Sequence, residues 1–168
     1  WYRAPELLLG QRQYFCPADV WSAGCIFAEM LHRHPIWPGG SANGSSIGLA
    51  SPSAERSGHL DQLCKIFHTL GTPTELSWPG MSRLPAYLYY RPDFPPAGAD
   101  LHTLATPDLD DQGLDVLLRM LQVDPEQRIT AVAALEHPWF VSADQARKAA
   151  FKGSVTDSVA RVDAIALE

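Results

Sequence analysis

The residues best equipped for chemistry are the cysteines and histidines, which serve as nucleophiles, general bases and metal ligands. The three cysteines are Cys16, Cys25 and Cys64, an odd number with no C-x-x-C spacing. This pattern argues against a disulfide framework and against a zinc site, and it favours thiols in a reducing compartment. His32 and His34 stand near the end of an expected helix, without a cysteine or carboxylate ligand pattern. We therefore expect no metal site.

A stretch rich in glycine and serine, residues 39–58, is the second candidate, because glycine-rich loops can cradle phosphate groups. The stretch follows no expected strand, and the sequence has no G-x-G-x-x-G pattern. Its composition also offers little to bury. We therefore interpret it as a flexible surface loop and not as a nucleotide site.

Four helices are expected to form the framework that positions any site. Residues 17–31 begin with Pro17, which suits a first helical turn, and are apolar almost all round, which is typical of a buried helix. Residues 59–70 carry one apolar stripe and are followed by a glycine and a proline that end the helix. Residues 111–121 place leucines at positions i, i+3, i+4 and i+7, and residues 130–136 form a short helix that ends before a proline.

The remaining segments show no sustained periodicity. Residues 72–100 are rich in proline, tryptophan and tyrosine, and we expect an irregular segment that packs through its aromatic side chains. Residues 143–151 are compatible with a helix inside an otherwise loose terminus. Since no convincing pair of strands is found, the sequence predicts a mostly α fold.

Composition and charge limit the possible partners. The chain has 168 residues, of which 46% are hydrophobic and 19% charged, which is ordinary for one globular domain. Its net charge is −6, with 13 Lys and Arg against 19 Asp and Glu. Because nucleic acids and anionic membranes select clustered positive charge, we expect neither as a partner. No apolar run reaches the roughly 18 residues of a membrane span, and no signal pattern opens the chain.

Several short motifs follow one another along the chain. They are W-Y-R-A-P-E at 1–6, D-V-W-S-A-G-C-I-F-A-E-M at 19–30, L-G-T-P-T-E at 70–75, W-P-G at 78–80, D-P-E-Q-R-I-T at 124–130 and H-P-W-F at 137–140. The first ends on A-P-E, the closing signature of a protein kinase activation segment. Together, over residues 1–140, the motifs resemble the C-terminal lobe (C-lobe) of a Ser/Thr protein kinase. The third and fourth resemble the cyclin-dependent kinases specifically.

This resemblance implies a fold and a domain organisation. The fold is mainly α and of the kinase C-lobe type, a helical bundle around a buried central helix, without the N-terminal lobe and the catalytic loop. Residues 1–140 form the partial kinase domain, with a flexible insert at about 40–58, and residues 141–168 form a C-terminal tail. The insert is longer than in typical relatives, and it is either a real loop or an unspliced intron.

The resemblance also implies roles for residues at the two ends of the domain. Glu6 and Arg128 would form a buried ion pair that ties the activation segment to the helical core, a task that suits the planar fork of arginine. The alternative is two solvated surface charges. Trp1 and Arg3 would belong to the pocket that receives the substrate residue after the phosphoacceptor. That pocket favours proline, which has no N–H in need of a partner; the alternative is that both are packing residues.

The start of the central helix carries two further implied roles. Asp19 would accept hydrogen bonds from the backbone of the catalytic loop, and with Trp21 it would form the structural anchor of that loop. The alternative for Asp19 is a carboxylate that meets the positive end of the helix. Cys16 occupies the position where relatives have a capping Ser or Thr, so the capping hydroxyl is missing, and Pro17 compensates in part.

Phosphate transfer in kinases needs a glycine-rich loop, a strand lysine, an H-R-D loop and D-F-G. None of these motifs occurs in this sequence, which opens on Trp1 rather than Met. We therefore expect a piece of a longer or processed protein, with no catalytic residues in this chain and no activity alone. ATP and Mg²⁺ would be the cofactors of the intact enzyme, and no residue present here would bind them.

The leading function is therefore the C-lobe portion of an ATP-dependent, proline-directed Ser/Thr kinase of cyclin-dependent type, providing the substrate platform and the structural core. The expected partners are proteins with Ser/Thr-Pro sites and a cyclin that binds the missing N-terminal part. The expected location is intracellular, in the nucleus, the cytoplasm or both. Two alternatives stay open, namely a non-catalytic truncated kinase that acts as a protein-binding module, and an incomplete gene product.

Overall fold

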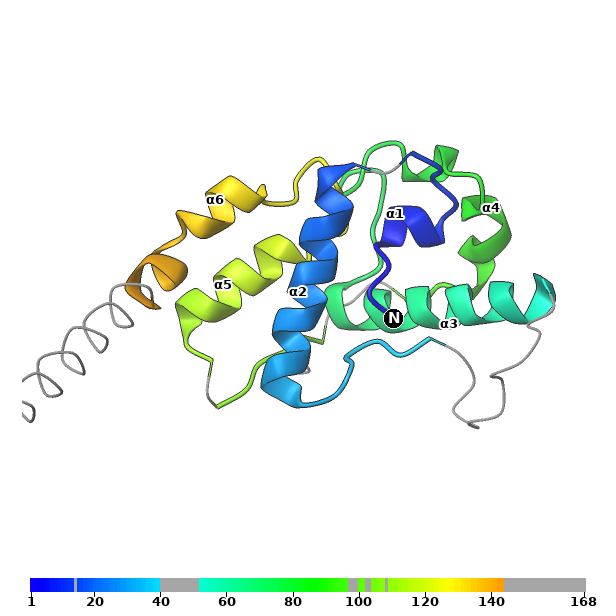
Figure 1. The fold of residues 1–168 in the computed structure, drawn as a ribbon. Coiled ribbons are helices and arrows are strands. Elements are labelled where there is room, and N and C mark those ends of the chain that lie inside the picture. Colours follow the sequence, from blue (N-terminus) through cyan, green and yellow to red (C-terminus); the bar gives the residue numbers. More distant parts are fainter. Residues whose placement is uncertain (14, 40–51, 97–99, 102–103, 108, 144–168) are drawn as a thin grey trace, which may run out of the picture. The chain divides into compact units, whose positions relative to one another are not determined.

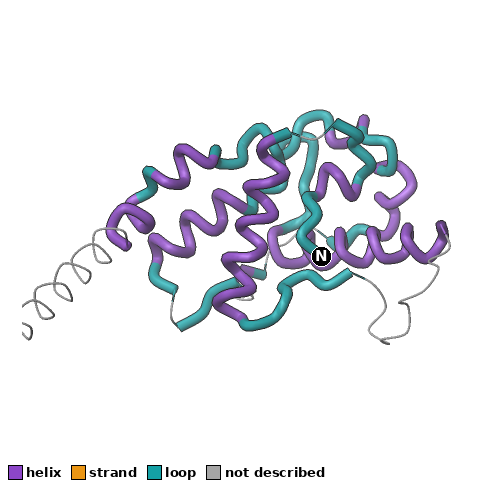
Figure 2. The backbone as a smooth tube through the Cα atoms, in the orientation of Figure 1, coloured by secondary structure: helices purple, strands orange, loops and turns teal. Residues whose placement is uncertain are grey.

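The described part of the structure consists of helices and loops and has no strand, which confirms the expected mainly α fold (Figure 2). The structure is a computed structural model, and it describes residues 1–13, 15–39, 52–96, 100–101, 104–107 and 109–143. No described helix is both long enough and apolar enough to cross a membrane. The helices follow in the order α1 Pro5–Leu8, α2 Cys16–His32, α3 Pro52–Leu70, η1 Met81–Arg83, α4 Tyr87–Tyr90, η2 Arg91–Asp93, α5 Asp111–Met120 and α6 Ala131–Leu135.

The chain divides into two compact units, Trp1–Thr130 and Ala131–Glu168. The second unit is described as far as residue 143, and it contains α6 and a further helical stretch at 138–143. The expected short helix at 130–136 is thus confirmed. Helix α6 begins one residue later and ends one residue earlier than expected. The helix considered for 143–151 lies outside the described residues, apart from its first position.

The central helix of the first unit is α2, as the sequence predicted. It begins at Cys16, so the capping position belongs to Phe15 and not to Cys16. Phe15 has no side-chain oxygen, so the helix start lacks a side-chain cap. The sequence also predicted a missing cap, but because of Cys16 at the capping position. Asp19 lies in the first turn, and Arg33 ends the helix in a left-handed conformation with φ 63°.

The core of the first unit forms around α2, and α5 lies directly against it (Figure 1). Gly24 permits this close approach, because a Cβ there would come within 2.9 Å of Leu121 Cδ2. Trp21 is fully buried and stacks on Trp37, with ring centroids 5.4 Å apart. Leu63 and other apolar residues of α3 complete the core.

The expectation that α2 is buried on almost every side is wrong, because one side of the helix is exposed to solvent. Ile26 and Met30 are 51% and 75% exposed, although their neighbours Cys25 and Ala28 are buried. Together with Ala23, the two form an exposed apolar stripe along the helix, because positions i, i+3 and i+7 share one face. The sequence pattern showed that every side of α2 is apolar, but it did not show which elements of this chain would cover each side.

Helix α3 corrects a second expectation. The composition of residues 39–58 predicted a loop, yet the helix already begins at Pro52. A proline is tolerated in a first helical turn because its missing N–H has no intrahelical partner there. Gly58 lies inside the helix at a cost of about 1 kcal/mol relative to alanine, which the long packed helix tolerates. Residues 40–51 of the expected insert lie outside the described residues.

The segment 72–100 is more regular than expected. It contains the short helical elements η1, α4 and η2, each only one turn long. As predicted, aromatic side chains anchor it, since Trp78 and Tyr90 are buried and Phe94 packs edge-on against Phe67 of α3. Single helical turns have no periodicity to detect, so the sequence pattern could not reveal them.

Candidate functional site: an anchored N-terminal segment

A buried ion pair fixes the N-terminal segment to the core. The guanidinium of Arg128 donates from Nη1 and Nη2 to the two carboxylate oxygens of Glu6, over 2.8 and 2.9 Å. The side chains of both residues are almost completely buried, and the residues are 122 positions apart in the sequence. The paired geometry is the bidentate arrangement that suits arginine and a carboxylate.

Arg128 also joins several elements of the first unit. It donates to the backbone oxygens of Pro17, Gln122 and Val123, over 2.8, 2.8 and 3.3 Å. Its guanidinium carbon lies 5.1 Å from the centre of the Trp21 ring, within the range of a cation–π contact. One side chain thus links the N-terminal segment, the start of α2 and the turn after α5.

Two further contacts, which the sequence analysis missed, hold the same segment against α2. The phenol of Tyr2 donates to Glu29 Oε2, and Ser22 Oγ donates to the Tyr2 carbonyl oxygen over 3.0 Å. The hydrogen bond with Glu29 raises the pKa of the Tyr2 phenol above its ordinary value. A signal for this contact was present, because Glu29 is the one carboxylate in the apolar second half of the helix.

Trp1 and Arg3, the predicted substrate-binding residues, lie together on the surface at the start of the anchored segment. Both side chains are exposed, and Trp1 is 58% exposed. The indole Nε1 of Trp1 donates to the carbonyl oxygen of Gly39 over 2.9 Å. Arg3 Nη1 lies 2.9 Å from Nε2 of His59 on α3. The two residues therefore form an accessible edge on a segment whose other side is fixed to the core.

Asp19 and Trp21, the predicted anchor of a catalytic loop, differ in their surroundings. Asp19 is exposed in the first turn of α2, at the head of the stripe formed by Ala23, Ile26 and Met30. Trp21 is buried, and its indole N–H has no hydrogen-bond acceptor among the described residues. The geometry leaves the Asp19 carboxylate accessible to donors, and its role as an anchor stays a prediction.

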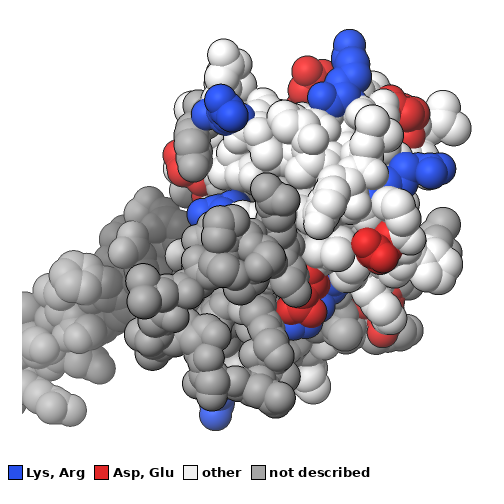
Figure 3. Space-filling model, turned by 90° about the vertical axis from the view of Figure 1, so that its right-hand side faces the viewer, with Lys and Arg blue, Asp and Glu red and all other residues white. Residues whose placement is uncertain are grey.

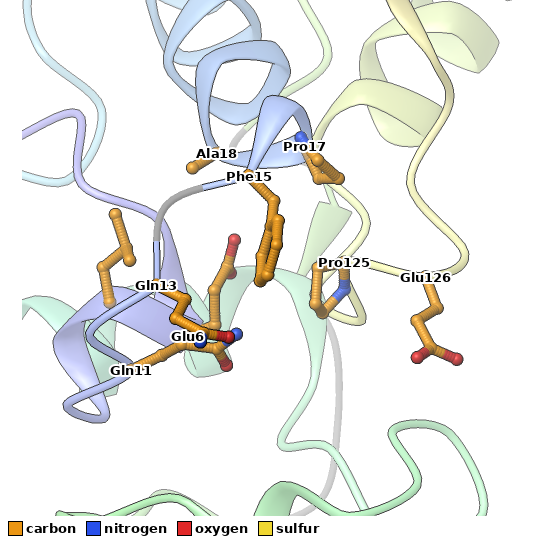
Figure 4. Close-up of a pocket in the computed structure, with 9 residues that line it drawn as sticks. Glu6, Gln11, Gln13, Phe15, Pro17, Ala18, Pro125 and Glu126 are labelled. Carbon is orange, nitrogen blue, oxygen red and sulfur yellow. The ribbon is translucent and has the colours of Figure 1, made fainter.

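A cavity of about 320 Å³ lies beside the ion pair (Figure 4). The ring of Phe15 stands between the side chain of Gln13 and Pro125, and Glu6 also lines the cavity. A second cavity, of about 480 Å³, lies between the connection before α3 and α3 itself. Its wall includes Lys65, which pairs with Asp61 over 2.7 Å.

Burial disfavours the reactive thiolate form of two of the three cysteines. Burial raises the pKa of Cys25 to about 12, so its reactive thiolate form is strongly disfavoured. Burial also raises the pKa of Cys64, with the carboxylates of Asp61 and Asp93 as lesser causes. Within the described ranges, no cluster of three His, Cys, Asp or Glu side chains could hold a metal ion. The face in Figure 3 shows acidic and basic side chains interspersed among uncharged ones.

The site is therefore a segment that is fixed to the core and presents an exposed edge, and the described residues form no catalytic constellation. Of the six predicted site residues, the structure brings Glu6 together with Arg128, places Trp21 beside Arg128, and leaves Trp1, Arg3 and Asp19 at the surface. A family model, that of the protein kinase domain, matches residues 1–140. The match covers most of the chain, and the chain belongs to the protein kinase family.

Proposed function

We propose that the chain is the C-lobe portion of an ATP- and Mg²⁺-dependent, proline-directed Ser/Thr kinase of cyclin-dependent type, in which it supplies the substrate platform. The observation that carries the proposal is the combination of a fixed segment and an exposed edge. Glu6 is held by Arg128 in the core, whereas Trp1 and Arg3 stay accessible only a few residues away. A platform of this kind binds an extended substrate with little loss of its own conformational entropy.

The uncovered side of α2 supports the same proposal. The apolar stripe of Ala23, Ile26 and Met30, headed by the accessible carboxylate of Asp19, combines apolar surface with a hydrogen-bond acceptor. A catalytic loop with free backbone N–H groups and apolar neighbours has the complementary chemistry. In a longer kinase chain, this side of α2 would therefore hold the loop that carries the catalytic residues.

The test is a kinase assay on the full-length native gene product. It is incubated with ATP, Mg²⁺ and two peptides that differ only in the residue after the phosphoacceptor, Ser-Pro in one and Ser-Ala in the other. We expect phosphate transfer to the Ser-Pro peptide and much slower transfer to the Ser-Ala peptide. The Arg3→Ala variant should lose part of this preference while it keeps the wild-type unfolding midpoint, because the Arg3 side chain is exposed.

Two results would contradict the proposal in different ways. Equal rates on the two peptides would contradict the proline-directed specificity but not the kinase activity. No transfer by the full-length product, with any cyclin supplied, would exclude the kinase reaction. That outcome would favour a non-catalytic module that binds proteins through the exposed edge.

A further inference from the structure

Helix α3 and Gly39 hold the first residues of the chain through contacts that are separate from the ion pair. Gln62 is 4% exposed, and its Nε2 donates to the carbonyl oxygen of Trp1 over 2.8 Å. The indole of Trp1 donates in turn to the carbonyl oxygen of Gly39. His59, one helical turn before Gln62, contacts Arg3. Because residues three apart lie on one face of a helix, a single face of α3 holds both Trp1 and Arg3.

Gly39 packs tightly against this face of α3. A Cβ at Gly39 would lie 3.2 Å from Gln62 Oε1 and 3.3 Å from the carbonyl oxygen of Gly58, which is closer than side chains normally approach. A glycine therefore allows the backbone here to reach both Gln62 and the indole of Trp1. The Trp1 main chain and side chain are thus held by two different partners, one of them buried.

The contact between Arg3 and His59 has one possible direction. A guanidinium has only N–H donors, so Arg3 donates and Nε2 of the His59 imidazole is the acceptor. The imidazole restrains one edge of the Arg3 guanidinium, which would otherwise move freely on a long exposed side chain.

We propose that His59 and Gln62 are positioning residues for the substrate pocket, His59 through Arg3 and Gln62 through Trp1. The inference rests on the proposed function. It adds one face of α3 to the residues that form the substrate platform. The substrate class is an extended peptide whose residue after the phosphoacceptor meets Arg3 and Trp1. When both residues are held before the peptide arrives, binding immobilises fewer side chains, and the Michaelis constant is lower.

The experiment measures steady-state kinetics of the full-length native gene product on a Ser-Pro peptide, with three histidine variants. His59→Leu removes the acceptor, and we expect the KM for the peptide to rise about two- to tenfold with kcat unchanged. His59→Gln retains an acceptor at a similar reach and should restore most of the affinity. His68→Leu makes the same change at an exposed histidine further along α3 and should leave both constants at their wild-type values.

A second position keeps the test independent of His59. Gln62→Met preserves the length of the buried side chain but removes the donor to Trp1, so KM should again rise while kcat stays unchanged. Unfolding midpoints of all variants identify any loss of affinity that follows from misfolding. If the wild type is active and neither His59→Leu nor Gln62→Met changes the KM, the inference is overturned while the proposed function stands. An inactive wild type would overturn the proposed function as well, so the two failures are distinguishable.

Discussion

Removal of the Arg128 side chain is the sharpest perturbation that the structure offers. Arg128→Ala leaves the carboxylate of Glu6 buried without its bidentate partner, at 4% exposure. It also removes the donors to three backbone carbonyl oxygens and the cation that lies over the Trp21 ring. The variant therefore breaks the ion pair completely and removes one donor from each of three backbone oxygens that are buried or partly buried.

The magnitude follows from the burial of both partners. Breaking a buried ion pair by removing one member costs about 3–5 kcal/mol, because the remaining charge is uncompensated. In a cooperative unit of about 150–250 residues, such a loss lowers the unfolding temperature by about 6–20 °C. Arg128→Lys should fall between wild type and Arg128→Ala, since lysine keeps the charge but cannot form the planar fork. Replacement of both Glu6 and Arg128 by apolar residues should cost less than Arg128→Ala alone, because no charge remains buried.

The assay is thermal and urea unfolding of the full-length protein, followed by the fluorescence of its tryptophans. Arg119→Ala is the matched control, because Arg119 pairs with Asp115 on the surface of α5, where both side chains are about half exposed. An exposed pair of this kind contributes about 0–1 kcal/mol. An unfolding midpoint of Arg128→Ala equal to that of the Arg119→Ala control would refute the reasoning that the Glu6 pair anchors the segment.

Three further predictions concern other contacts of the first unit. Gly24→Val should destabilise the protein by about 1–3 kcal/mol in urea unfolding, because a side chain there collides with Leu121, whereas no shift would show that the helices can separate freely. Tyr2→Phe removes the phenol that donates to α2, and amide hydrogen exchange measured by mass spectrometry should become faster in the first four residues and stay unchanged in α5. A thiol reagent at pH 8 should modify exposed Cys16 in the native protein and Cys25 only after unfolding, and early labelling of Cys25 would contradict its burial.

The helices that the sequence predicted well are those with a strong period and clear ends. The expected range 17–31 differs by one residue at each end from Cys16–His32, and 111–121 differs by one residue from Asp111–Met120. The start of α3 was missed, because glycine and serine made residues before 59 typical of a loop. Local composition gave the wrong answer there, since a helix that is packed further along can extend through about two weak turns at its start.

The candidate site was predictable only where a motif linked distant residues. No period or local spacing relates Glu6 to Arg128, and the pair was expected solely because each lies in a motif of the kinase family. The contacts of Tyr2 and Gln62 belong to no such expectation and depend on how α2 and α3 approach the first residues. The sequence shows only that Gln62 is a polar residue directly beside the apolar stripe of α3, and its burial, which requires a hydrogen-bond partner, is visible only in the structure.

The composition of α2 and its uncovered stripe have a common explanation under the proposed function. A helix that is apolar on every side is stable only when every side is covered, yet Ile26 and Met30 face solvent here. The exposed stripe starts at the carboxylate of Asp19, so a segment that covered it would combine apolar side chains with hydrogen-bond donors at one end. Under the proposed function, a catalytic loop would meet both requirements. The ion pair of Arg128 and the stripe would then hold two different segments, one at the start of α2 and one along its exposed side.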